Sequence, residues 1–218
     1  MKERVVIVNL GTGNLRSVYR AFEFAGGKGD VTISADPEII RDADRLVLPG
    51  QGAIGTWMGQ LQRDTRLKGA VLERLSQGPV LGICLGLQAL LDQSEENGGQ
   101  QGLGLIPGQV RHFSPVHQSA GHSHLGLKIP HMGWNEVSQK ADHPLWHDIQ
   151  DNARFYFVHS YYADAADQST VVGESTFGNT FTCAVARDNL FATQFHPEKS
   201  QQAGLQLIKN FIHWNGVQ

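Results

Sequence analysis

VLGICLGLQ, residues 80–88, is the stretch that decides the fold of this chain. Its first apolar residues predict a buried strand, and Leu85–Leu91 predicts a helix that begins directly after it. Cys84 lies at the junction, with Gly82 and Gly86 two residues away on either side. This spacing is the cysteine version of the G-x-S-x-G nucleophile elbow, in which small flanking residues relieve the crowding of a sharp strand-to-helix turn.

Such an elbow predicts a reactive thiol at Cys84. The turn is expected to direct the sulfur away from the sheet edge and over the helix N-terminus, where the dipole and free N–H groups favour the thiolate. The alternative is a free cysteine that packs at the end of a strand, because free cysteines are among the most buried residues. The elbow alone does not separate the two interpretations.

A second segment, Thr193–Ser200, contains the groups that a nucleophilic cysteine needs. The nucleophile requires a base, and the base requires a group that fixes its tautomer and orientation. In an extended segment, residues two apart point to the same side, so His196 and Glu198 are expected to lie together, with Pro197 stiffening the link. His-Pro-Glu alone indicates an ordinary turn, but together with the Cys84 elbow it predicts a nucleophile, a base and an orienting carboxylate.

Composition narrows the class of protein. A chain of 218 residues fits one domain, 1–218, and a net charge of −3 with 18% charged residues predicts no nucleic-acid partner and no membrane-surface partner. Two cysteines give no disulfide framework. The N-terminus leads directly into a strand without room for a signal peptide, and no apolar run approaches membrane-spanning length. We therefore expect a cytoplasmic protein.

The first part of the chain alternates strand and helix patterns. Strands are expected at Arg4–Leu10, Val31–Ser34 and Arg45–Leu48 and in the elbow strand; helices are expected after Gly11–Asn14, at Pro37 and over Thr56–Gln77. This alternation predicts an α/β fold with an open, mostly parallel, flavodoxin-like sheet flanked by helices.

From Leu103 onward, short strand patterns follow one another and predict antiparallel additions at one side of the sheet. They are Gln109–Phe113, Leu125–Ile129, Trp134–Val137, Arg154–Val158, Thr170–Ser175, Phe181–Arg187 and Leu190–Phe195. Ser200–Trp214 predicts a final helix, with the Ser200 hydroxyl as its N-cap.

Three histidines in a segment rich in Gly and Ser, His117, His122 and His124, invite a metal interpretation. The segment has no Cys or carboxylate that would complete a zinc ligand set, so a solvated hairpin tip is the better interpretation. Cys183 lies in an apolar run without flanking glycines and is predicted to be a core residue. We expect neither a metal nor a cofactor.

The Cys84 elbow and His196-Pro197-Glu198 resemble the motifs of the triad-type, class I glutamine amidotransferases. Further stretches are similar, more narrowly, to the glutaminase subunits of imidazole glycerol phosphate synthase. They are GTGNLRSV at 11–18, PGQG at 49–52, PHMGWN at 130–135, FVHSY at 157–161 and HPEKS at 196–200. The resemblance runs from the first strand to the last helix.

This resemblance implies that Cys84, His196 and Glu198 hydrolyse L-glutamine. The elbow geometry provides the Leu85 N–H as one oxyanion donor, and the resemblance adds Gln51 and Gly52 as the source of the second. It also implies residues that contact glutamine: Gly52, Gln88, Glu96 (facing the α-ammonium), Ser160 and Tyr161. Without the family, Gln88 is a polar helix residue and Glu96 belongs to a solvated acidic loop.

The resemblance further implies a (β/α)₈-barrel cyclase subunit in a heterodimer. That subunit would use the ammonia on a ribulosyl-formimino carboxamide nucleotide, giving imidazole glycerol phosphate and an aminoimidazole carboxamide ribonucleotide in histidine biosynthesis. Candidate interface residues are Asn14, Met132, Trp134 and Lys199, although a lone Trp in a strand is more often part of a core. Two alternatives stay open: a triad amidotransferase that serves another synthase, and a binding module without turnover.

Gln51 departs from the resembling subfamily, in which the residue between the two loop glycines is small and apolar. A peptide unit between glycines rotates with little steric penalty, so either its C=O or its N–H can face the site. We expect the N–H state to be the minor one in the isolated chain. Glutamine hydrolysis would then depend on the docked partner and its ligand.

Overall fold

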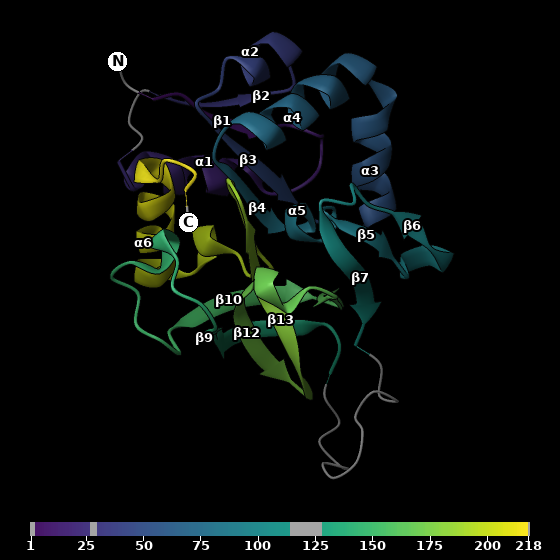
Figure 1. Cartoon of the computed structure of the whole chain (residues 1–218), viewed down its shortest axis with the longest axis vertical. Coiled ribbons are helices and arrows are strands. Elements are labelled where there is room, and N and C mark those ends of the chain that lie inside the picture. The colour runs from purple at the N-terminus through teal and green to yellow at the C-terminus, as the bar shows by residue number, and fades with distance from the viewer. Residues whose placement is uncertain (1–2, 27–29, 114–127, 218) are drawn as a thin grey trace.

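The computed structural model describes residues 3–26, 30–113 and 128–217. A large sheet with the strand order β2-β1-β3-β4-β14-β13-β11-β7-β5-β6 forms its centre (Figure 1). The first strands in this order are parallel: β2 (Val31–Ser34), β1 (Val5–Val8), β3 (Arg45–Gly50), β4 (Val80–Cys84) and β14 (Leu190–Thr193). This half of the sheet confirms the predicted parallel α/β fold.

Antiparallel pairing begins where β14 meets β13. The remaining strands are β13 (Asn179–Arg187), β11 (Tyr161–Ala165), β7 (Ile106–His112), β5 (Leu91–Ser94) and β6 (Gln100–Gln101), with β12 (Val171–Phe177) and β9 (Ser138–Gln139) attached through β13. A second sheet consists of two antiparallel strands, β8 (His131–Glu136) and β10 (Arg154–His159). The predicted antiparallel additions are therefore confirmed, although β5 pairs parallel with β7.

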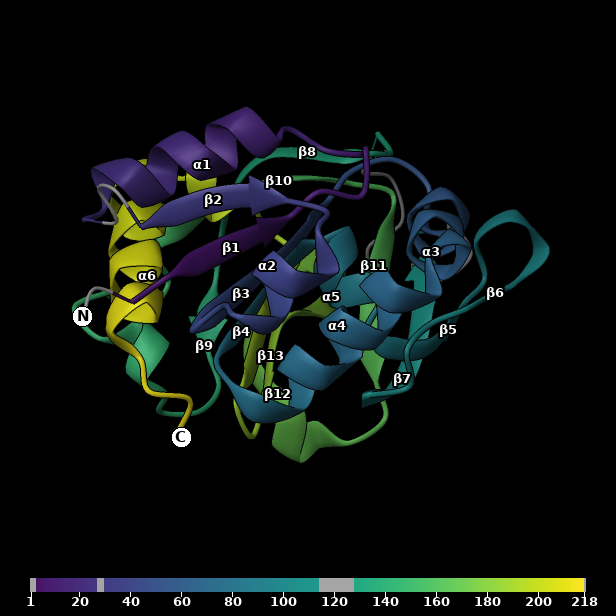
Figure 2. The same ribbon diagram turned by 90° about the horizontal axis from the view of Figure 1, so that it is seen from above.

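Helices cover both faces of the parallel half, as Figure 2 shows from above. On one face lie α1 (Leu15–Phe24) and α6 (Gln201–His213); on the other lie α2 (Pro37–Arg41), α3 (Ile54–Arg63) and α4 (Thr65–Gln77). Side chains alternate along β1, so Val5 and Ile7 join the α1–α6 core while Val6 and Val8 join the other core. Short helical turns complete the chain: α5 (Leu85–Gln88), η1 (Glu96–Gly98), η3 (Pro144–Trp146), η4 (Gln168–Thr170) and η5 (Pro197–Lys199).

Two predicted helices are wrong in extent. The Thr56–Gln77 helix is divided at Asp64, whose carboxylate accepts hydrogen bonds from the first N–H groups of α4 and so starts a new helix. The Leu85–Leu91 helix ends at Gln88, and β5 begins at Leu91. The Ala89 and Leu90 carbonyls, which would continue the helix, instead accept from the N–H groups of residues 103, 105 and 106.

Other differences concern caps and strands. The Ser200 hydroxyl does not cap α6; it donates to the His196 carbonyl and accepts from the Tyr156 N–H. Most of the expected 125–129 strand lies outside the described residues, and Lys128 and Ile129 belong to no strand. Strands that the sequence did not predict are β5, β6, β9 and β11. The Val31–Ser34 strand is present as β2 with the predicted ends, and the other predicted strands are present with shifted ends. Within the described residues, no helix is long and apolar enough to cross a membrane.

Candidate active site

The elbow is present at the end of β4, and its glycines are sterically required. Cys84 has φ 56° and ψ −102°, a strained conformation for a residue with a side chain. A Cβ at Gly86 would lie 1.9 Å from the Leu48 carbonyl oxygen, and one at Gly82 would lie 2.8 Å from the Ala192 Cβ. The predicted need for small residues at both flanks is therefore confirmed.

The helix that follows Cys84 is shorter than expected. It has 4 residues, Leu85–Gln88, so the long helix dipole expected beneath the sulfur is absent here. Side chains surround the sulfur instead: the Gln194 Nε2 lies 3.7 Å from the Cys84 Sγ, and His196 lies close enough to be affected by the charge of Cys84. Neighbouring side chains therefore dominate the environment of the Cys84 sulfur.

His196 and Glu198 form a buried pair. The Nδ1 of His196 lies 2.7 Å from Glu198 Oε1, and the two side chains are 2% and 1% exposed. The expected extended segment is wrong, because Pro197 begins the turn η5 directly after His196. The turn nevertheless brings the two side chains together, so the expected pairing is present with different backbone geometry.

His196 is electrostatically distinct from the other buried histidines. Burial lowers the pKa of His196, but the negative charges of Cys84 and Glu198 and hydrogen bonding outweigh that effect and raise it to about 10. Its Nε2 is buried without a hydrogen-bond partner among the described residues. The imidazole is thus held by Glu198 at one nitrogen and left available at the other.

A cavity of about 260 Å³ opens over Cys84 and gathers the residues expected to bind glutamine. Its lining consists of Gln51, Gly52, Cys84, Leu85, Gln88, Glu96, Val158, His159, Ser160, Tyr161 and Lys199. These residues come from widely separated parts of the sequence. The structure therefore brings every expected oxyanion and glutamine-contact residue to one cavity.

The loop after β3 lies against the elbow. A Cβ at Gly50 would lie 2.7 Å from the Leu85 Cβ, whereas Gly52 has φ +94° and open space where a Cβ would be. Glu96 reaches this region from another segment: its Oε2 accepts a hydrogen bond of 2.8 Å from the Ile54 N–H at the start of α3. Because Ala53 provides no side-chain cap, Glu96 caps α3, a role that the sequence did not reveal.

The candidate interface residues lie beside this cavity or at the surface. Met132 and Trp134 of β8 are 63% and 37% exposed, so Trp134 is not a core residue. The Lys199 Nζ lies 5.9 Å from the centre of the Tyr156 ring, which also contacts Trp134 edge to face. Asn14 is exposed and accepts from the Ser17 N–H at the start of α1.

Sequence reasoning missed Gln194, which is fully buried and whose amide contacts Cys84. The only available signal was its position, two residues before His196. It also missed the buried pair His131 and His159, whose ring nitrogens Nδ1 and Nε2 lie 2.9 Å apart. A polar side chain within an apolar strand pattern gives no indication of what it contacts.

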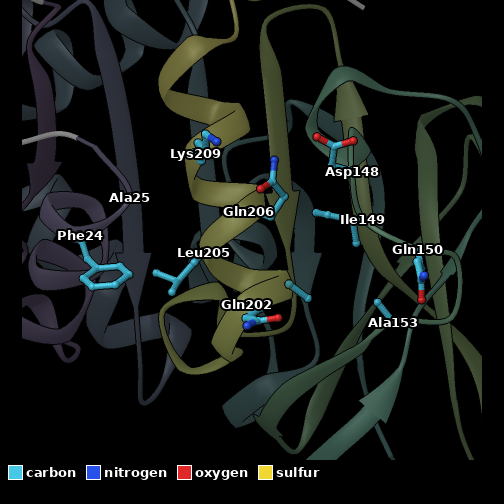
Figure 3. Close-up of a pocket in the computed structure, with 11 residues that line it drawn as sticks. Phe24, Ala25, Asp148, Ile149, Gln150, Ala153, Gln202, Leu205, Gln206 and Lys209 are labelled. Atoms are coloured by element: carbon cyan, nitrogen blue, oxygen red, sulfur yellow. The ribbon is translucent and has the colours of Figure 1, made fainter.

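A larger hollow, about 670 Å³, lies away from the triad (Figure 3). Side chains of α6 lie in its middle, between Phe24 and Ala25 at one edge and Asp148, Ile149, Gln150 and Ala153 at the other. Polar and apolar groups are mixed there, and none of Cys84, His196 and Glu198 contributes.

The histidines considered as metal ligands, His117, His122 and His124, lie outside the described residues. Among the residues that the structure describes, no group of three or more His, Cys, Asp or Glu is arranged to hold a metal ion.

A cysteine elbow at the end of a central parallel strand, beside a buried His–Glu pair, defines a thiol-dependent acyl-transfer or hydrolytic site. Comparison with known families specifies the class. Residues 6–214 match the family model described as glutamine amidotransferase class-I, and the chain belongs to that family.

The relatives are similar over nearly their whole length. The chain is 51% identical to imidazole glycerol phosphate synthase subunit HisH of Pseudomonas syringae pv. syringae, covering 98% of this chain and 99% of the relative. It is 49% identical to the protein of the same name from Nitrosomonas europaea, covering 96% and 98%.

Solved structures with low sequence identity share the fold. The glutaminase domain of Trypanosoma brucei CTPS with bound acivicin has a TM-score of 0.63 at 14% identity, covering 99% of this chain and 96% of that chain. A glutamine amidotransferase from Thermotoga maritima has a TM-score of 0.56 at 17% identity, covering 91% and 77%.

Proposed function

We propose that residues 1–218 form one glutamine amidotransferase domain, the glutaminase subunit of a cytoplasmic imidazole glycerol phosphate synthase of histidine biosynthesis. The observation that carries this proposal is the Cys84 elbow, which lines the cavity, together with the buried His196, whose pKa is raised by Cys84 and Glu198. Identities of about half over nearly full length to HisH subunits support the choice of synthase.

The triad performs the reaction in two stages. His196 Nε2 takes the thiol proton before glutamine reacts and keeps it, because the pKa of His196 is raised to about 10; the thiolate of Cys84 then attacks the carboxamide carbon of glutamine to form a tetrahedral oxyanion. When the oxyanion collapses, the C–N bond breaks, His196 returns the proton to the leaving nitrogen, and ammonia departs from a γ-glutamyl thioester. Water, deprotonated by His196, then hydrolyses the thioester to glutamate and restores the thiol. Glu198 holds Nδ1 throughout and stabilises the imidazolium.

The oxyanion needs donors where its charge develops. The backbone N–H of Leu85, directly after the nucleophile, is one donor. The second comes from the Gln51–Gly52 loop, where Gly52 has open space on its side-chain side and permits rotation of the peptide unit. With the carbonyl facing inward, the second donor is lost, which lowers the rate by roughly a hundred- to a thousand-fold.

Glutamine is held by the remaining groups of the cavity. Glu96 faces the α-ammonium of the substrate, and the backbone of Ser160 and Tyr161 completes the pocket. Gln88 contributes its Oε1, because its Nε2 already donates to the Tyr161 carbonyl and to Gln194 Oε1. Glu96 also caps α3, so the substrate-binding carboxylate is connected to the oxyanion loop.

The product ammonia requires a partner. In neutral water it is mostly protonated, and the ammonium ion is not a nucleophile, so delivery needs a path with little water. We place a (β/α)₈-barrel cyclase in a heterodimer against the face formed by Asn14, Met132, Trp134 and Lys199. Exposed apolar side chains on β8, beside the cavity, support this face.

Glutaminase assays of the chain alone, with a barrel cyclase, and with the cyclase plus its acceptor nucleotide test the proposal. The isolated chain should be nearly idle and the full set of components active, with imidazole glycerol phosphate formed in proportion to glutamate. A chain that hydrolyses glutamine but fails to couple to the cyclase would instead serve another synthase. A chain that never forms glutamate would be a binding module.

A further inference from the structure

Gln194 contributes a completely buried amide to the active site. It follows β14 and is 0% exposed, and its backbone N–H donates to the Cys183 carbonyl. The side-chain Nε2 lies 3.7 Å from Cys84 Sγ, within the range of a hydrogen bond to sulfur. A buried polar side chain aimed at a nucleophile needs a reason beyond packing, because burying an amide without partners is unfavourable.

A backbone carbonyl fixes the orientation of this amide. The Nε2 of Gln88 lies 3.0 Å from the Tyr161 carbonyl oxygen and 3.1 Å from Gln194 Oε1. Because a carbonyl only accepts, Gln88 must present its NH₂ group there. The same NH₂ group then requires an oxygen from Gln194, which leaves the Gln194 NH₂ group directed at the sulfur.

The Tyr161 carbonyl is itself held by a chain of imidazoles. The Nδ1 of His159 donates to it at 2.7 Å, so the His159 Nε2 must accept from Nδ1 of His131 at 2.9 Å. The remaining nitrogen of His131 then accepts from the Asn135 amide at 3.2 Å. Burial keeps both rings neutral by lowering the pKa of His159 to about 3 and that of His131 to about 4. Each bond in the chain therefore has one permitted direction.

We propose that Gln194 is a further catalytic residue, which donates a hydrogen bond to the Cys84 sulfur and stabilises the thiolate. This inference rests on the proposed function and adds an uncharged donor to the triad. A hydrogen bond to the charged form of a group favours that form. The donor remains in place when the thioester breaks and the negative charge returns to sulfur, so it favours departure of the thiolate as well.

The test measures the reactivity of Cys84 without glutamine or a partner. Gln194→Met removes the donor at similar volume, and Gln194→Glu retains an oxygen opposite Gln88 and removes the donor once its carboxyl is ionised. The rate of Cys84 alkylation by iodoacetamide is followed against pH by peptide mass spectrometry, with Gln93→Met, at an exposed position in β5, as the matched control. Other titratable groups also lie near the sulfur. They are His196 and, in the cavity lining, Glu96, His159, Tyr161 and Lys199.

Both variants should shift the midpoint of the alkylation profile to higher pH, with the larger shift in Gln194→Glu. In the partner-activated enzyme, kcat should fall about 10- to 100-fold, the size expected for a hydrogen bond to a charged group, while KM changes less. If both folded variants keep the wild-type alkylation profile, Gln194 is only a packing residue and the proposal is wrong. Absence of glutaminase activity in the wild-type chain with the cyclase and its acceptor nucleotide would overturn the proposed function instead, and alkylation would still report on Gln194.

Discussion

The two cysteines of this chain are both buried, yet their surroundings are opposite. Cys183 lies within β13, fully buried, and burial raises the pKa of its thiol well above the ordinary value. Cys84 lies two strands away at a strained elbow, with an amide and an imidazole directed at its sulfur. Burial alone makes a cysteine inert, whereas donors and a base placed beside a buried sulfur favour its reactivity.

Buried histidines show the same contrast. His159 and His131 have neutral partners, and burial lowers their pKa values to about 3 and about 4. His196 is equally buried, but its carboxylate and thiolate neighbours raise its pKa. What each side chain contacts, and not its depth, determines its chemistry.

Removing each thiol in turn gives the largest expected difference. Cys84→Ala should lower glutaminase turnover on the order of 10⁴-fold or more, because no other group forms the thioester. Ammonia-driven synthesis by the partner should be retained. Cys183→Ala should leave turnover within about twofold and lower the free energy of unfolding by about 1 kcal/mol, the ordinary effect of a core truncation. Turnover by Cys84→Ala above a few per cent of wild type would remove Cys84 from the nucleophile role.

Glu198→Gln should have the next largest effect. A neutral amide still meets the imidazole but no longer stabilises its positive charge, so we expect a loss of about 10²- to 10³-fold in kcat. The alkaline limb of the kcat profile should also move to lower pH, because the pKa of His196 loses part of its upward shift. Wild-type kcat and an unchanged profile would mean that another group orients His196.

Substitution in the Gln51–Gly52 loop, the proposed source of the second oxyanion donor, should change the glutaminase rate less. If the inward N–H state is rare because of Gln51, Gln51→Gly should raise the basal glutaminase rate of the isolated chain about 10-fold, a part of the effect of one oxyanion donor. The rate with partner and acceptor should change little. Full activity of the unmodified isolated chain would contradict the switch.

Substitutions at the proposed interface should lower the affinity for the cyclase, by a smaller factor than the triad substitutions lower turnover. Trp134→Ala and Lys199→Ala should each weaken cyclase binding about 10-fold, as truncation of a moderate interface anchor does. Phe24→Ala is the matched control, because Phe24 is 78% exposed but lies beside the separate hollow of Figure 3. Calorimetric titration that gives unchanged affinity and coupling for both interface variants would exclude this face.

The neutral histidine pair predicts a modest pH effect on stability. Burial lowers the pKa of His131 from 6.5 to about 4 in the folded protein. Between these two pH values His131 is protonated in the unfolded chain but stays neutral in the folded one. The free energy of unfolding should therefore fall as pH drops through this window. His131→Phe, which replaces a ring stacked on Phe157 and Phe177, should flatten this dependence in denaturant titrations. An unchanged slope would show that His131 is not responsible.

The sequence predicted what local patterns determine. Glycine spacing identified the elbow, and the spacing of His196 and Glu198 identified their pair, because each depends on residues close in sequence. It did not predict the end of α5, where carbonyls are taken by residues 103–106, or the contact of Gln194 with Cys84. Those features depend on segments that meet only in the folded sheet, and a single sequence contains no local signal for them.

Trapping the acyl-enzyme tests the central claim most directly. The chain, activated by its partner, is given glutamine, quenched in acid and digested, and both cysteine peptides are examined by mass spectrometry. A γ-glutamyl thioester should appear on the Cys84 peptide of the wild type and of Cys183→Ala, and on no peptide of Cys84→Ala. A thioester on Cys183, or glutamate formed by Cys84→Ala at the wild-type rate, would contradict the account.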